Sequence, residues 1–197
     1  MNVAQLRPGL WCWTVADRVG VFLVSDGALV LIDPVLPEPD SSDEERFWRA
    51  LDRDVERIGR PPLLLLTTTD PQPALGRAVS AVRGRYPGAR AVGPATSGDG
   101  FAPGAELPGG VATHATAVPQ RAVLWIAVHG VIAAGDELIA DRGGLRLTPH
   151  DPAQISIERR RTALMPLLEL PVELVLTSRG EPVVVDAGAA LRAALRA

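Results

Sequence analysis

The chain has 197 residues, 47% of them hydrophobic and 22% charged, which is the composition of a globular protein long enough to bury a full core. Its formal net charge of -3 argues against nucleic acid or an anionic membrane as the main partner. The single cysteine, Cys12, excludes an intrachain disulfide and a cysteine-based zinc site. No apolar run approaches the roughly 20 residues of a membrane span and no signal peptide is recognisable. We therefore expect a single domain over residues 1–197, in the cytoplasm.

The N-terminal part predicts strands followed by a helix. "GLWCWTV" alternates in the manner of a half-buried strand. "VFLVSDGALVLIDP" predicts a hairpin, because Asp26-Gly27 accepts the positive φ angles of a tight turn. A helix over about 42–58 follows, with Ser42 and Glu45 at capping-box spacing.

The middle of the chain begins with the buried strand "LLLL" and the loop "TTTDPQP". Asp70-Pro71 reads as an N-cap followed by proline at the first helical position, which predicts a helix over about 71–86. "ARAVGPA" is a short strand, and 96–110 is a Gly- and Pro-rich loop.

The C-terminal part predicts strands in "VATHATA", "AVLWIAV", "VIAAGDELI" and "VELVLTS". Helices are expected at about 153–170, where Pro166 kinks or ends the helix, and from Asp186 onward. This order of elements indicates a layered α/β domain with two sheets.

Four segments together resemble the metallo-β-lactamase fold family: "GVFLVSDGALVLIDP", "LLLLT" before a loop and helix, "AVLWIAVHGVIAAGDELI" and "PVELVLTSRGEPV". They occur in the family's order and at plausible spacing, and the similarity covers most of the chain. The resemblance implies a four-layer αββα sandwich, with two mixed sheets, outer helices and a metal site at the sheet edge. In active members a T-H-x-H-x-D-H motif, a third histidine, a Gly-Asp and a final His-Gly hold zinc, which activates water for hydrolysis.

This chain carries other residues at nearly all of the ligand positions. Thr67 matches the leading threonine and Gly135-Asp136 matches the Gly-Asp, whereas the stretch Thr67–Pro73 contains no histidine. For the third histidine position Ala117 aligns best, with His114 as a nearby alternative. The resemblance therefore implies a vestigial site made of Thr68, Asp70, Gln72, Pro73, Ala117, Asp136 and Arg179.

Two hypotheses follow from this loss. The first is a pseudoenzyme, a non-catalytic binding or assembly module with no cofactor; its partner is an unknown small molecule or protein, and a homodimer is the generic expectation. The second is a metal-dependent hydrolase with a rebuilt single-metal site, in which zinc is held by Asp136, Asp70 and either His114 or His150. The sequence favours the first, because no substitute ligand cluster is visible.

One further expectation concerns Asp136. A partly buried carboxylate without its metal needs another cation, and Arg179 occupies the position of the final histidine. We therefore predict an ion pair between Arg179 and Asp136, with a solvent-facing Arg179 as the alternative.

Overall fold

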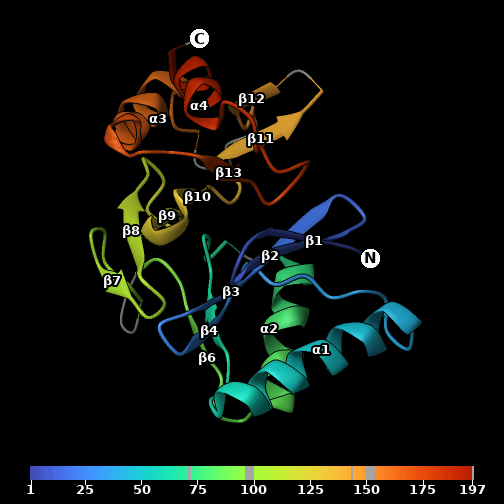
Figure 1. The fold of residues 1–197 in the computed structure, drawn as a ribbon. Helices are drawn as coiled ribbons and strands as arrows, with labels where there is room; N and C mark the ends of the chain where they lie inside the picture. Colours follow the sequence, from blue (N-terminus) through green and yellow to red (C-terminus); the bar gives the residue numbers. More distant parts are fainter. Residues whose placement is uncertain (71, 96–99, 143, 150–153, 197) are drawn as a thin grey trace.

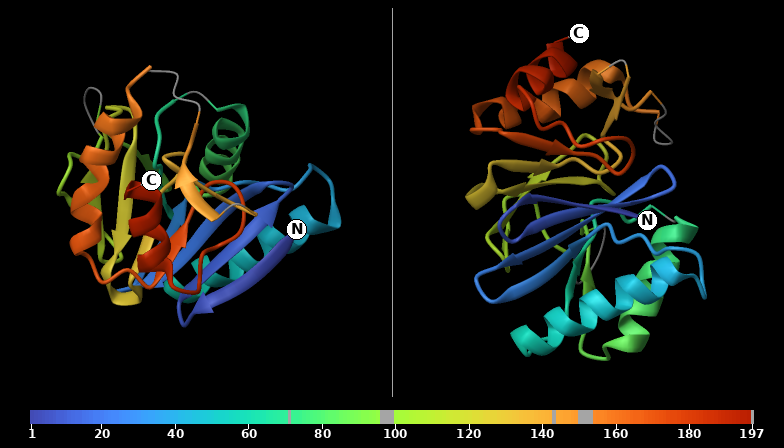
Figure 2. Two further views of the ribbon diagram at one scale, coloured as in Figure 1. Left: turned by 90° about the horizontal axis from the view of Figure 1, so that it is seen from above. Right: turned by 45° about the vertical axis from the view of Figure 1, so that its right-hand side comes forward.

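The computed structural model describes residues 1–70, 72–95, 100–142, 144–149 and 154–196. Figure 1 shows a layered arrangement, with helices at the bottom, one β-sheet stacked on another in the middle and further helices at the top. The right-hand view of Figure 2 shows the same stacking from another side, with the N-terminus at the open edge of the lower sheet. The predicted αββα sandwich with two mixed sheets is confirmed.

The first sheet has six strands in the order β1-β2-β3-β4-β5-β6. Its first four strands form an antiparallel meander, and β5 and β6 then add in parallel to β4. The predicted hairpin at Asp26-Gly27 joins two of these strands, and both turn residues have the positive φ that the turn requires. The strands are β1 (Asn2–Arg7), β2 (Leu10–Val15), β3 (Arg18–Ser25), β4 (Ala28–Ile32), β5 (Leu63–Leu65) and β6 (Arg90–Val92).

The second sheet has five strands in the order β13-β10-β9-β8-β7, with β13 parallel to β10 and the others antiparallel. A separate two-stranded sheet, β11-β12, packs through β12 against the C-terminal helix α4 (Ala187–Arg196). The strands are β7 (Glu106–Leu107), β8 (Val111–Ala115), β9 (Ala122–Ile126), β10 (Val131–Ala133), β11 (Leu138–Asp141), β12 (Gly144–Leu147) and β13 (Leu174–Leu176). Between β9 and β10 the chain makes a 3₁₀ turn, η1 (Ala127–His129), and Gly130 then reverses its direction.

Two helices, α1 (Ser42–Ile58) and α2 (Pro73–Arg85), cover the outer face of the first sheet. The N-cap of α1 is Ser41, whose hydroxyl accepts the backbone N–H of Glu44, so the cap lies one residue before the predicted one. The Glu44 carboxylate accepts the N–H of Asp40 rather than that of Ser41, so the reciprocal bond of the predicted capping box is not formed. The prediction that Asp70 caps α2 is wrong, because the helix begins at Pro73 after the N-cap Gln72.

The second sheet is covered by α3 (Ile157–Leu164), the 3₁₀ helix η2 (Met165–Glu169) and α4 (Ala187–Arg196). Pro166 lies at the start of η2, so it ends the α-helix as expected. None of the helices in the described ranges combines the length and the apolar character that a membrane crossing requires.

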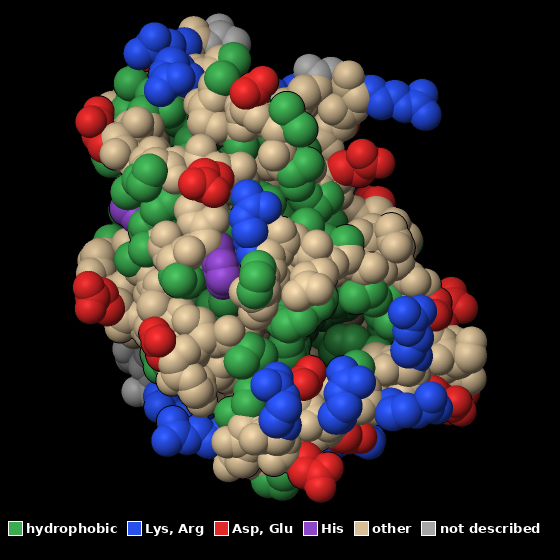
Figure 3. All heavy atoms as spheres, in the orientation of Figure 1, with side chains coloured by type: hydrophobic (Ala, Val, Ile, Leu, Met, Phe, Trp, Pro, Cys, Tyr) green, Lys and Arg blue, Asp and Glu red, His purple; other side chains and the backbone are tan. Residues whose placement is uncertain are grey.

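The core has three parts, one between each pair of adjacent layers. Leucine and valine side chains from both sheets fill the central part, which includes Leu23, Ile32, Leu124 and Leu176. The other faces of the sheets pack on α1 and α2 and on the C-terminal helices. On the face in Figure 3, arginine and acidic side chains are interspersed over the lower helices, rather than separated into patches of one sign.

Candidate functional site

The candidate site lies where strands of both sheets end at one edge of the sandwich. The parallel pairs β4-β5 and β10-β13 place their carboxyl ends side by side. Polar residues directly after strands therefore converge there, as they do in other open α/β sheets. Arg18 joins them because β3 is antiparallel to β4 and begins at the same edge.

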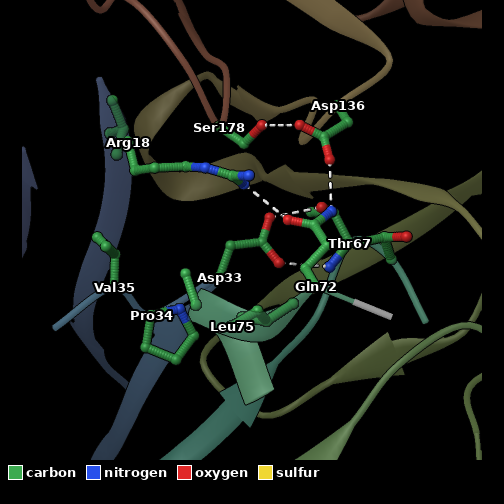
Figure 4. A pocket seen from close by; sticks show the side chains of 12 residues that line it. Arg18, Asp33, Pro34, Val35, Thr67, Gln72, Leu75, Asp136 and Ser178 are labelled. Atoms are coloured by element: carbon green, nitrogen blue, oxygen red, sulfur yellow. Dashed lines mark hydrogen bonds between the residues drawn. The ribbon is translucent and has the colours of Figure 1, made fainter. Parts of the chain in front are cut away.

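These side chains surround a small cavity, shown in Figure 4. Only about 20 Å³ remains among them, enough for one or two water molecules. The polar residues that line it are Arg18, Asp33, Thr67, Thr68, Gln72, Asp136 and Ser178.

A chain of hydrogen bonds crosses the cavity. A guanidinium N–H of Arg18 donates to Oε1 of Gln72 at 2.6 Å, and Nε2 of Gln72 donates to Oδ2 of Asp136 at 2.6 Å. The Ser178 hydroxyl donates to the other oxygen of Asp136. Both carboxylate oxygens of Asp136 are thus engaged, and a positive charge lies one side chain away (Figure 4).

Asp33 connects the ends of β4 and β5. Its carboxylate accepts the backbone N–H of Thr67 at 2.8 Å and the Thr67 hydroxyl at 2.5 Å. Burial is the main cause that raises the pKa of Asp33 from 3.8 to about 6, while the two Thr67 hydrogen bonds lower it. The charge of Asp136 raises this pKa further and the charge of Arg18 lowers it, so the two carboxylates and the guanidinium are electrostatically coupled.

Gly135 brings Asp136 into the cavity. It has a φ of +54°, and a Cβ there would lie 2.0 Å from Oγ1 of Thr67. Only glycine allows the β10–β11 turn to approach the end of β5 this closely. The Gly-Asp pair that the sequence retains is therefore explained by packing as well as by chemistry.

Several residues of the predicted site do meet here. Thr68, Gln72 and Asp136 line the same cavity although they come from distant parts of the sequence. The structure therefore brings these three predicted positions together.

Other predicted site residues lie elsewhere. The Asp70 carboxylate pairs with Nε of Arg121 at 3.3 Å. Pro73 is the first residue of α2, and Ala117 lies in the connection between β8 and β9, outside the residues that line the cavity. His114 is on β8, where burial lowers its pKa. His150 lies outside the described residues.

The predicted ion pair between Arg179 and Asp136 is wrong. The Arg179 side chain is 47% exposed and its nearest carboxylate is that of Asp17, at 3.9 Å. The neighbouring Ser178 instead donates its hydroxyl to Asp136, whereas Arg179 points outward.

The sequence reading missed Arg18, Asp33 and Ser178. Asp33 had a recognisable signal, because it directly follows the buried strand β4, much as Thr67 lies two residues after the end of β5. Arg18 had none, since a charged residue next to the β2–β3 turn is ordinarily solvent-exposed.

A buried ionic cluster around Glu137 lies next to the site. Glu137, which is 1% exposed, receives Arg121 at 3.4 Å and Arg160 at 3.1 Å. Arg160 also donates to the backbone carbonyl of Thr148 at 2.7 Å. The cluster connects α3 to the segment that carries Asp136.

The donor set does not fit zinc. A catalytic zinc takes about three good protein ligands, usually histidine or carboxylate. In the described ranges no three His, Cys, Asp or Glu side chains are grouped as a metal site would require. The oxygens of Asp33 and Asp136 already accept hydrogen bonds, and the cation that faces them is the guanidinium of Arg18.

No protein-family model and no curated protein matches this chain. Solved structures do match over nearly its whole length. A metallo-β-lactamase from Pontibacter korlensis aligns with a TM-score of 0.67 at 16% identity, over 99% of this chain and 98% of that one. FIM-1 from Pseudomonas aeruginosa, in its mono-zinc form, gives a TM-score of 0.67 at 12% identity, over 99% and 94% of the two chains. The enzyme from Hirschia baltica gives 0.62 at 10% identity, over 98% and 97%. At such identities the likeness establishes the fold.

Proposed function

We propose that this chain, which has the metallo-β-lactamase fold, has lost the zinc site and acts as a non-catalytic binding or assembly module in the cytoplasm. The observation that carries the proposal is the hydrogen-bonded chain Arg18–Gln72–Asp136–Ser178 across the candidate site. It places a permanent cation and a neutral amide beside the carboxylate that a metal ion would otherwise need.

The chemistry of hydrolysis supports the same proposal. A zinc centre attacks its substrate with a bound water whose pKa falls to about 7. Arginine stays protonated and an amide neither takes up nor releases a proton near neutral pH, so neither generates hydroxide. Asp33, whose pKa is about 6, has both oxygens engaged by Thr67 and is not free to act as a general base.

The alternative, a rebuilt single-metal site around Asp136, has less support. Asp70 is paired with Arg121, and His114 is not among the residues that line the cavity. With the space already filled by Arg18 and Gln72, about 20 Å³ also leaves no room for a substrate.

Metal analysis tests the proposal. The protein is purified without a metal-affinity step, incubated with zinc or manganese, dialysed and analysed by plasma mass spectrometry. We expect well under one metal ion per chain, and no β-lactam or thioester hydrolysis that responds to added zinc or to a chelator. One tightly held metal ion per chain, together with chelator-sensitive hydrolysis, would overturn the proposal.

A further inference from the structure

The outer strand of the first sheet, β1, has an unprotected edge. Its only neighbour is β2, and no other described strand pairs with it. Residues 2–5 are exposed, and none of the first five residues of the strand is charged. Natural edge strands usually carry charges, proline or early bulges that prevent pairing with another chain. Here the irregularity comes only at the end of the strand, between Gln5 and Arg7.

A groove runs along the inner face of this edge. It has a volume of about 690 Å³, lies beneath β1 and β2 and is closed on its other side by the segment 180–184. Small side chains such as Ala4 and Cys12 make it hollow. Val184 and Val185, which are 52% and 73% exposed, form an apolar lip. The unpaired edge of β1 therefore lies close to the exposed apolar side chains of Val184 and Val185.

Charge is distributed unequally along the edge. Arg7 lies at the carboxyl end of β1, and its side chain is 39% exposed. Asp17, which is 68% exposed, and the exposed Glu181 line the groove. Asp17 lies in the turn between β2 and β3, near the amino end of β1. An antiparallel copy of β1 reverses the order of these ends. It would bring its Arg7 toward the acidic end of the first copy, and the reverse contact would form by symmetry.

We propose that β1 pairs with β1 of a second copy of this chain, in antiparallel orientation about a twofold axis, so that the two first sheets become continuous. The proposal rests on the function proposed above, a binding or assembly module, and names its partner. In a twofold antiparallel pair, opposite residues share a face. Two such registers pair five residues of β1, one centred on Ala4 and one on Gln5, and the irregularity between Gln5 and Arg7 interrupts the second. The register is therefore centred on Ala4, with Val3 opposite the partner's Gln5.

This register gives a charge-swap test on two exposed positions. Val3→Lys combined with Gln5→Lys places like charges opposite each other at two sites, whereas Val3→Lys combined with Gln5→Glu places opposite charges there. Neighbours within one chain are the same in both variants apart from the sign of one charge. Sedimentation velocity should give the wild type a mass of twice 20.8 kDa. The Lys/Lys variant should dissociate roughly tenfold or more readily than the Lys/Glu variant.

Crosslinking tests the symmetry axis. Ala4 lies opposite its own copy, but within one chain it is also opposite Cys12. Ala4→Cys is therefore made in a Cys12→Ser background, where mild oxidation should give a covalent dimer. The exposed residue Val128, on η1, offers a control, because Val128→Cys in the same background should not crosslink as a dimer.

A wild type that stays monomeric at high concentration overturns the proposal. So does a result in which the Lys/Lys and Lys/Glu variants dissociate equally readily. Capture of an extended peptide by a monomer would also overturn it. The metal analysis is independent of these results. A monomer without bound metal would contradict the proposed dimer but not the proposed metal-free site. A dimer with bound metal would contradict the metal-free site but not the dimer.

Discussion

Replacing Arg18 tests whether its guanidinium stabilises the metal-free site. Arg18→Ala removes a charge-assisted hydrogen bond of 2.6 Å to Gln72 and the one cation that lowers the pKa of Asp33. A hydrogen bond to a charged group contributes about 1.5–3 kcal/mol, and leaving two neighbouring carboxylates without a cation adds to the loss. We expect the free energy of unfolding near neutral pH to fall by about 2–4 kcal/mol.

The effect should depend on pH, because Asp33 titrates. The pKa of Asp33 in the folded protein is about 6, above its ordinary value of 3.8. Its contribution to stability is therefore fully present at pH values below 3.8. That stability is lost as the pH rises through about 6, by up to roughly 3 kcal/mol. Without Arg18 the pKa of Asp33 rises further, so the stability that depends on protonated Asp33 continues to fall at higher pH. Arg18→Ala should therefore cost more at about pH 8 than at about pH 5, where Asp33 is protonated with or without Arg18.

Urea unfolding followed by tryptophan fluorescence at both pH values measures this difference, and carboxyl NMR measures the pKa of Asp33 directly. Arg53→Ala is the matched control, because Arg53 is 74% exposed and its contact with Asp54 is long, at 3.9 Å. Its loss should change stability by less than about 0.5 kcal/mol at either pH. Equal losses from Arg18→Ala at both pH values, or an unchanged pKa of Asp33, would refute the electrostatic role of Arg18. Millimolar methylguanidinium, which can re-enter the vacated space, should recover part of the stability of Arg18→Ala and none of that of Arg53→Ala.

Three further substitutions separate the parts of the site. Glu137→Ala should cost about 3–5 kcal/mol in urea unfolding, because it leaves two buried guanidiniums without their shared carboxylate. Gly135→Ala should lower the melting temperature strongly, since its Cβ would meet Thr67 at 2.0 Å in a backbone with positive φ; a melting temperature within a degree or so of wild type would contradict that packing. Arg179→Ala should change stability by less than about 0.5 kcal/mol, as expected for an exposed contact with Asp17, and a loss above about 2 kcal/mol would return Arg179 to the site.

The fold could be predicted because its signals are local. The apolar stripe of α1, the Asp26-Gly27 turn and the alternation in β2 each follow from a short segment. Short elements gave no such signal: β1, β7 and β12 were not expected, and the single strand predicted in "VIAAGDELI" is divided into β10 and β11, which belong to different sheets. The helix α2 begins two residues later than the Asp70-Pro71 pattern indicated. Asp70 can cap a helix in principle, but here its carboxylate is used by Arg121, 51 residues away in sequence.

The site could be predicted only where backbone geometry decides it. Thr68, Gln72 and Asp136 meet because parallel strands end together, whatever their side chains are. The group that faces Asp136 depends on side-chain direction. After β13, the neighbouring residues Ser178 and Arg179 point to different sides. The sequence analysis assigned the role to Arg179, whereas the structure places Ser178 against Asp136.

The position of Arg18 explains how two neighbouring carboxylates are compensated by one cation. Arg18 enters from the antiparallel strand beside β4. Its charge acts directly on Asp33, and the amide of Gln72 connects it to Asp136. The amide of Gln72 is suited to this place because it accepts from the guanidinium and donates to Asp136 at the same time. A carboxylate there would add a third negative charge and, when ionised, could not donate to Asp136. Gln72 therefore links the cation of Arg18 to the carboxylate of Asp136 at this position.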